Sequence, residues 1–163
     1  MNDSMLGEIG SKMKAALVGT IKGTDDLYDT LFETVRGNVV SLLGGSEDVT
    51  VAAMNTVKDM VVGAIHAVHE IGGDVGTTVK DTVRGAITGV SQVEGDVVEA
   101  SVHAVTGAIA GVREVGGDVG KATTDAVTGA IEAAGAVSET TVKEVKETLA
   151  ESVDGAKDVI HKL

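Results

Sequence analysis

The chain has 163 residues and contains no Cys, no Pro and no Trp, with one Tyr, one Phe and 22 Gly. The absence of Cys excludes disulfides, thiol catalysis and Cys-based zinc sites, and the shortage of large side chains favours thin elements packed at close approach. A net charge of −12 and a pI near 4.6 argue against nucleic acid as a partner, because its affinity comes from Lys and Arg, and against an anionic membrane surface.

Residues 1–14 are predicted to be a lead-in to a repeat region. They hold acidic residues and glycines where a secretory leader has a basic and then an apolar stretch. No window of the chain approaches the roughly 18 apolar residues of a membrane-spanning helix. We therefore expect a cytoplasmic protein.

A tandem repeat occupies 15–163. Gly-Ala-Ile recurs at 63–65, 85–87, 107–109 and 129–131, each copy 22 residues after the previous one, and an Asp-Val pair follows it at a constant offset in the first three of these copies. The spacing predicts seven copies, the last truncated, with a four-residue insertion near 50–56.

Within each copy the apolar residues recur in steps of three and four, which is the periodicity of a helix. A copy of 22 residues is two units of 11, and each unit makes three helical turns. The sequence therefore predicts an all-α fold of amphipathic helices, each with a Val/Ile stripe. We expect this stripe to be a self-association surface, and it consists of Val61, Ile65, Val68, Val83, Ile87, Val90, Val105, Ile109, Val112, Val127 and Ile131.

A lane of small residues runs beside the stripe. Small residues four apart allow two helix backbones to approach closely, so their recurrence predicts a packing surface. The small-residue lane consists of Gly63, Ala67, Gly85, Gly89, Gly107, Gly111, Gly129 and Ala133.

Two arrangements of these helices fit the pattern. The stripe keeps its phase across each Gly pair, which favours long or gently kinked helices. Break signals favour the alternative, a stack of helices of about 18–20 residues in an α-solenoid or bundle, because Gly closes a helix and Thr, Ser or Asp caps the next. These signals stand at Gly23-Thr24, Gly45-Ser46, Gly73-Asp74, Gly95-Asp96 and Gly117-Asp118.

The motifs Val-Thr-Gly-Ala-Ile-Ala-Gly-Val at 105–112 and Val-Gly-Gly-Asp-Val at 115–119 resemble the 11-residue repeats of synucleins and perilipins. That resemblance implies long amphipathic helices on membranes or lipid droplets, although the polar face here is acidic where synucleins are Lys-rich. The same pattern is similar to bacterial proteins built from a 22-residue unit, which implies a bacterial origin and gives no activity to carry over to this chain.

Other candidate sites are better explained structurally. His66 and His69 have the spacing of helical metal ligands, but the pair occurs in a single copy, and we interpret both as surface residues. The recurring Asp48, Asp74, Asp96 and Asp118 are interpreted as helix caps or solvated charges. We expect no catalytic residue, no metal site and no cofactor.

The leading functional hypothesis is a structural protein whose helices bury the stripe against each other and form a homo-oligomer or filament. The alternative is an amphipathic coat on a lipid or polymer inclusion. A monomeric α-solenoid that binds a peptide is a third hypothesis, and the sequence shows no aromatic anchors for it.

Overall fold

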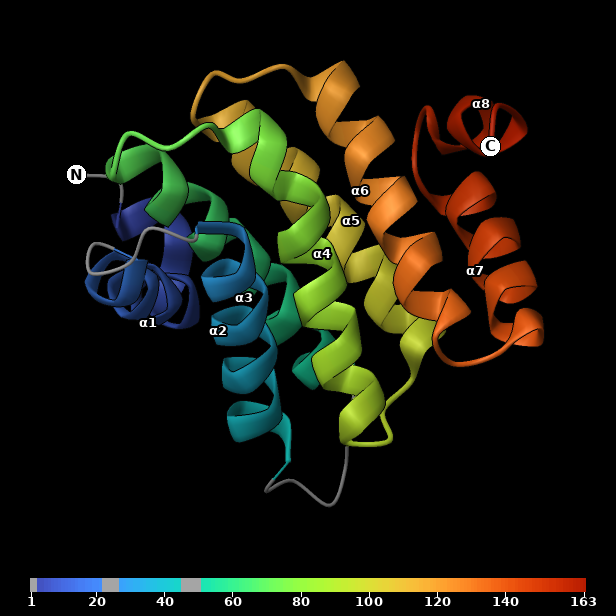
Figure 1. Cartoon of the computed structure of the whole chain (residues 1–163), viewed down its shortest axis with the longest axis horizontal. Helices are drawn as coiled ribbons and strands as arrows, with labels where there is room; N and C mark the ends of the chain where they lie inside the picture. Colours follow the sequence, from blue (N-terminus) through green and yellow to red (C-terminus); the bar gives the residue numbers. More distant parts are fainter. Residues whose placement is uncertain (1–2, 22–26, 45–50) are drawn as a thin grey trace.

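The computed structural model describes residues 3–21, 27–44 and 51–163, and within these ranges the chain forms helices and turns without strands. The predicted all-α fold is thereby confirmed for the described residues. The helices are α1 (Asp3–Ile21), α2 (Leu27–Leu43), α3 (Val51–Glu70), α4 (Val75–Gln92), α5 (Val97–Glu114), α6 (Val119–Gly135), α7 (Glu139–Ser152) and α8 (Ala156–His161) (Figure 1).

The C-terminal ends of α3, α4 and α5 close in the same way. In α3 the Gly73 N–H donates to the Val68 carbonyl at 2.9 Å, and the Gly72 N–H donates to the His69 carbonyl at 3.1 Å. This Schellman closure needs one residue in the left-handed region. Gly72 and Gly116 adopt it with φ of 79° and 78°, while α4 uses Glu94, with φ of 58°.

An aspartate then begins each following helix. The carboxylates of Asp74, Asp96 and Asp118 accept hydrogen bonds from the backbone N–H groups of Gly76, Glu99 and Lys121 at 2.9–3.1 Å. These bonds satisfy donors that the first helical turn leaves unpaired. The recurring aspartates at these three positions are therefore helix caps, whereas Asp48 lies outside the described residues.

The helices stack in two layers. The most extensive contacts join helices two apart in the sequence, namely α1 with α3, α2 with α4, α3 with α5 and α4 with α6. From α3 to α7 each turn reverses the chain, so consecutive helices run in opposite directions and helices two apart run the same way (Figure 1). Contacts of α7 with α5 and of α8 with α6 continue the two layers to the C-terminal end.

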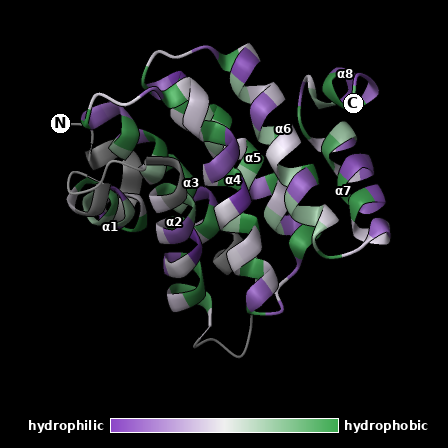
Figure 2. Cartoon of the chain, viewed as in Figure 1, coloured by the Kyte–Doolittle hydropathy of each residue, from purple (hydrophilic) through white to green (hydrophobic). Residues whose placement is uncertain are grey.

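The hydrophobic core lies between the layers. It joins buried Val, Ile, Leu, Met and Ala side chains from α1 to α8 in one cluster. Green hydrophobic segments alternate with purple and white ones along each ribbon, as expected of helices with one apolar face (Figure 2).

Glycines let helices within a layer approach closely. A Cβ built on Gly107 of α5 would lie 2.7 Å from the Lys58 carbonyl oxygen of α3, and one on Gly129 of α6 would lie 2.8 Å from the Lys80 carbonyl oxygen of α4. Gly85 approaches the Phe32 carbonyl of α2 in the same way, at 2.8 Å. A side chain at these positions would push two backbones apart.

The long or kinked helices favoured by the unbroken stripe are not found. The chain forms stacked short helices instead, which was the alternative interpretation. A Schellman closure followed by an aspartate cap satisfies the backbone groups at each break, so the helix gains nothing by continuing through the Gly pair. The residues of the lead-in 1–14 that the structure describes belong to α1. The breaks at Gly23-Thr24 and Gly45-Ser46, and part of the insertion near 50–56, lie outside the described residues.

Candidate functional site

The Val/Ile stripe faces the interior of the chain. Val61, Ile65, Val68, Val83, Ile87, Val90, Val105, Val112 and Val127 are each at most 2 % exposed. Ile109 and Ile131 are only partly buried, because the helices packed beyond them, α7 and α8, have 14 and 6 residues and cover less surface than a full copy. In this fold the stripe contacts helices of the same chain, and its residues other than Ile109 and Ile131 are closed to a second chain.

The small-residue lane lies between helices of one layer. All eight predicted positions, Gly63, Ala67, Gly85, Gly89, Gly107, Gly111, Gly129 and Ala133, are buried. A Cβ on Gly111 would lie 3.0 Å from Ile65 Cβ, and one on Gly63 would collide with the Gly10 carbonyl oxygen. Wherever such a contact is seen, the lane residue therefore packs against the helix that lies two positions earlier in the chain.

The lane continues onto α1 and α2, where no earlier helix covers it. Ala15 precedes Gly37, and Gly19 precedes Ser41, by the 22-residue repeat spacing. Gly37 and Ser41 precede Gly63 and Ala67 by 26 residues, because the four-residue insertion lies between them. A Cβ on Gly19 or Gly37 would meet no described atom within 4 Å, and Ala15, Gly19 and Ser41 are exposed. We name these four residues the open face.

The open face points away from the rest of the stack. In α1, Gly10 packs against Gly63 of α3, and Gly19 follows Gly10 by nine residues, which is about 180° around a helix. In α2, Val35 and Val39 pack against glycines of α4. The first two helices thus leave exposed or half-buried the same surface that α3 to α6 bury.

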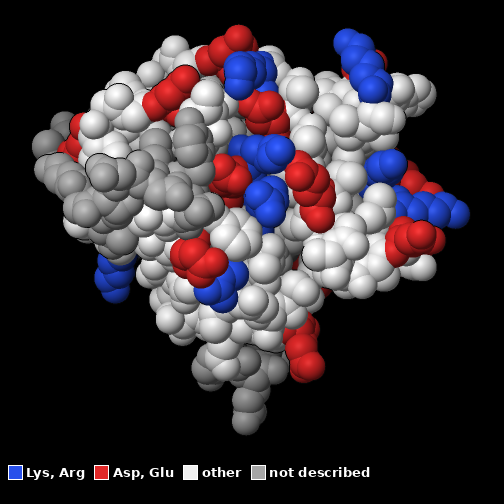
Figure 3. Space-filling view, viewed as in Figure 1, with Lys and Arg blue, Asp and Glu red and all other residues white. Residues whose placement is uncertain are grey.

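The opposite end of the stack has a different chemistry. On α7 the exposed residues include Lys143, Glu144 and Glu147, and on α8 they include Lys157 and Asp158. Charged side chains of both signs lie on this end among uncharged surface, and they also mix over the face of α4 and α6 (Figure 3). The two ends of the stack are therefore not copies of one surface.

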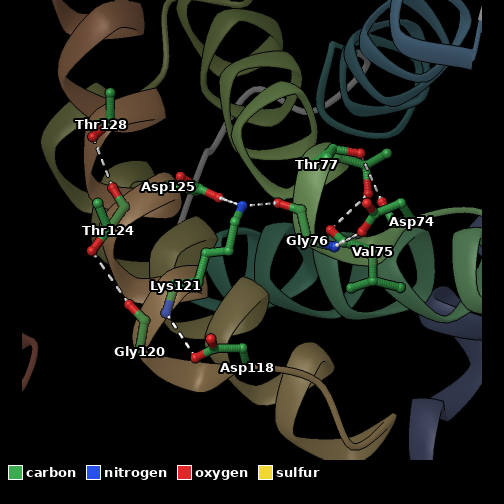
Figure 4. A network of polar contacts seen from close by, with 11 residues as sticks. Asp74, Val75, Gly76, Thr77, Asp118, Gly120, Lys121, Thr124, Asp125 and Thr128 are labelled. Carbon is green, nitrogen blue, oxygen red and sulfur yellow. Dashed lines mark hydrogen bonds and ion pairs between the residues drawn. The ribbon is translucent and has the colours of Figure 1, made fainter.

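A lysine links the N-terminal ends of α4 and α6. Lys121 Nζ donates to the Gly76 carbonyl and to the Asp125 carboxylate, both at 2.8 Å (Figure 4). The hydrogen bond to Asp125 raises the pKa of Lys121, and the nearby carboxylates of Asp74 and Asp118 act in the same direction. A lysine in the first turn of a helix is unfavourable for the helix dipole, and these carboxylates offset that effect. The network joins α4 to α6, and the partners of the Lys121 ammonium group are groups of the same chain.

The interpretation of His66 as a surface residue is wrong. Its side chain is 3 % exposed, and its Nε2 lies 2.8 Å from Glu114 Oε1. The contact ties α3 to α5, and it follows from the parallel packing of those helices, which the sequence alone does not reveal. His69 is exposed. Among the described residues no group of His, Asp and Glu has the arrangement of a metal site.

A solvent-open cleft of about 420 Å³ lies at the C-terminal part of the stack. Its walls come from α3, α5, the first turns of α6 and the turn between α7 and α8, and they include Lys58, Arg113 and Asp154. Sequence reasoning missed this cleft because Lys58, Arg113 and Asp154 are far apart in the chain and belong to no motif.

Comparison of the chain with known protein families, with curated proteins and with solved structures finds no match. Among the described residues no helix combines the length and apolar character needed to cross a bilayer.

Proposed function

We propose that this protein is a helical-repeat scaffold of the α-solenoid type that associates with itself, and that the open face of α1 and α2 makes the contact. The observation that carries the proposal is the uncovered lane at Gly19 and Gly37. In α3 to α6 the lane is buried, and wherever a contact of its glycines is seen, that contact is with another helix of the chain. A second copy would therefore add the same kind of packing.

A two-fold pairing of open faces fits better than a filament. A filament needs two different surfaces that complement each other at opposite ends, and the α7–α8 end carries charges of both signs beside the exposed Leu163 rather than a continuation of the lane. A two-fold contact needs one self-complementary surface. Small residues facing small residues allow two pairs of helices to come close together.

The contact is expected to be weak. Helices of 17 and 19 residues are about 25 Å long, and two of them side by side offer on the order of 500 Å² per subunit. The pair would bury about 1,000 Å², which is at the lower limit for specific interfaces. The net charge of −12 also repels like chains. We therefore expect a dimer that forms only at high protein concentration and strengthens with added salt, which screens that repulsion.

Sedimentation equilibrium tests the contact. We expect concentration-dependent dimers of the wild type, and monomers for Gly37→Glu, because the substitution adds bulk and places like charges across the two-fold axis. The matched control is Gly120→Glu, which makes the same change at an exposed glycine of α6 and should dimerise as the wild type does. A wild type that stays monomeric at all concentrations and salt levels, or a Gly37→Glu variant that dimerises normally, would contradict the proposal.

Cross-linking distinguishes pairing from a filament, since the chain has no native Cys. Under mild oxidation, Ser41→Cys should give disulfide-linked dimers, and Glu147→Cys at the far end should not. Mixed disulfides between the two variants would favour head-to-tail assembly. Flotation of the protein with lipid droplets, accompanied by loss of the dimer, would instead favour an amphipathic coat, which requires the buried stripe to open.

A further inference from the structure

Two lysines occupy equivalent positions in the stack, and they serve as a comparison within the molecule. Lys58 of α3 and Lys80 of α4 are 22 residues apart. The backbone carbonyl of each lysine faces a glycine two helices later, which is Gly107 for Lys58 and Gly129 for Lys80. A Cβ built on either glycine would lie 3.3 Å from the Cα and 3.3 Å from the Cγ of its lysine. Differences between them therefore reflect the surrounding side chains.

The two lysines differ in their partners. Lys80 Nζ lies 3.1 Å from Glu132 Oε2 of α6. The residue 22 positions before Glu132 is Ala110 of α5, so Lys58 has a methyl group where Lys80 has a carboxylate. In the described part of the chain, no carboxylate lies within ion-pair distance of Lys58 or of Arg113, and the carboxylate whose pKa the charge of Lys58 lowers is that of its chain neighbour Asp59.

Both cations line the 420 Å³ cleft. That volume falls in the range of small-molecule sites, which are mainly apolar with a few convergent polar groups. Ile109, Ala110, Val119 and Val153 supply the apolar wall, Thr106, Thr123 and Ser152 supply hydroxyl groups, and Asp154 is the one carboxylate among the lining residues. Two cations that form no ion pair thus converge on one cleft beside an apolar wall, in a chain whose net charge is −12.

We propose that this cleft binds a small organic monoanion, a carboxylate attached to a short apolar body. The guanidinium of Arg113 matches the geometry of a carboxylate, Lys58 supplies a second positive charge, and Ile109 with its neighbours covers the apolar body. Asp154 disfavours dianions such as inorganic phosphate. None of these residues belongs to the open face, so the site is independent of the proposed dimer.

Titration followed by NMR amide shifts tests the site, with octanoate as the probe. We expect saturable shifts around Ala110 and Val153 with octanoate, and none there with octylamine or inorganic phosphate. Lys58→Gln and Arg113→Gln should each weaken octanoate binding about tenfold or more, which corresponds to about 1.4 kcal/mol. Lys80→Gln is the matched control, because it changes the equivalent lysine outside the cleft and should bind as the wild type does.

Circular dichroism of each variant ensures that a loss of binding is not a loss of fold. Equal binding of octanoate and octylamine would show that the cleft selects for apolar bodies alone and would overturn the proposal. Normal octanoate binding by both Lys58→Gln and Arg113→Gln would overturn it as well. Binding of phosphate with no binding of octanoate would replace it with a simple anion site.

Discussion

At the scale of single residues, Glu94 is the position where side chain and backbone conflict. It adopts the left-handed conformation that Gly72 and Gly116 adopt in the two neighbouring turns. For a residue with a Cβ this conformation costs about 1 kcal/mol. The Schellman hydrogen bonds of Glu94 and Gly95, at 3.1 and 2.9 Å, are nevertheless made, so the fold imposes the closure even where the residue disfavours it.

Glu94→Gly should therefore stabilise the protein by about 1 kcal/mol, which for a chain of this size raises the melting temperature by about 3 °C. Glu94→Ala is the control, because it removes the same charge and keeps the strain, and it should leave the melting temperature nearly unchanged. Thermal melts followed by circular dichroism measure both. Equal melting temperatures for the Gly and Ala variants would show that the backbone at residue 94 is not strained.

Asp59 is a second residue with an unfavourable environment. Burial raises the pKa of its carboxyl group above the ordinary 3.8, and the charge of Lys58 only partly opposes this. The equivalent residue one repeat later, Asp81, has an ion pair with Arg84 at 3.2 Å, whereas Val62 stands at the position corresponding to Arg84. The folded state thus binds a proton on Asp59 more readily than the unfolded state does.

Because the folded-state pKa is raised, ionised Asp59 destabilises the fold, and stability is lost as pH rises from 3.8 through the raised pKa. Asp59→Asn should be more stable than the wild type at neutral pH, with the difference disappearing below pH 3.8. Asp81→Asn should show no such gain, since it breaks an ion pair. Urea unfolding at several pH values measures this, and a gain for Asp59→Asn that does not depend on pH would refute the explanation.

At the scale of elements, the glycine lanes set the distance between helices. Gly107, Gly129 and Gly85 face backbone carbonyls, which cannot move aside as a flexible side chain can. The sequence predicted a packing surface from the recurrence of small residues. It did not reveal that the partner is the helix two before, because that depends on the reversal of the chain at each turn.

Gly107→Ala tests this contact. Alanine favours helix formation by about 1 kcal/mol over glycine, yet its Cβ would lie 2.7 Å from the Lys58 carbonyl oxygen, and overpacking of this kind costs about 1–3 kcal/mol. We expect a net loss of stability in urea unfolding. Gly120→Ala, whose Cβ would meet only Asp118 Oδ1 at 3.4 Å, should be neutral or slightly stabilising. A stabilising Gly107→Ala would mean that α3 and α5 are further apart than described.

The choice between long and short helices also belongs to this scale. The stripe keeps its helical phase across Gly73 and Gly117, and this continuity favoured long helices. The break signals at the same places predicted the observed ends correctly, and three of the predicted caps are formed. Local capping determines where the helices end, because it satisfies backbone N–H and C=O groups as soon as each helix forms. The phase of the stripe affects stability only after the helices have packed.

At the scale of the whole molecule, the all-α fold and the residues of the core could be predicted from apolar periodicity. The role of those residues could not, because a stripe that must be covered can be covered by the same chain, by another chain or by lipid. Because the chain folds back on itself, most of the stripe is buried within one chain. The surface that is left uncovered is the open face on α1 and α2. The Lys58–Arg113 cleft could not be predicted either, because it depends on how α3, α5, α6 and α7 meet.

The most direct test of this account is small-angle X-ray scattering on dilute protein, extrapolated to zero concentration. A compact stack of 163 residues should have a radius of gyration of about 15 Å, rising with concentration as dimers form. One continuous helix would be about 240 Å long, with a radius of gyration of about 70 Å. A value near 15 Å is the result we predict, and a rod-like profile with the larger value would contradict the folded-back stack and the open face that depends on it.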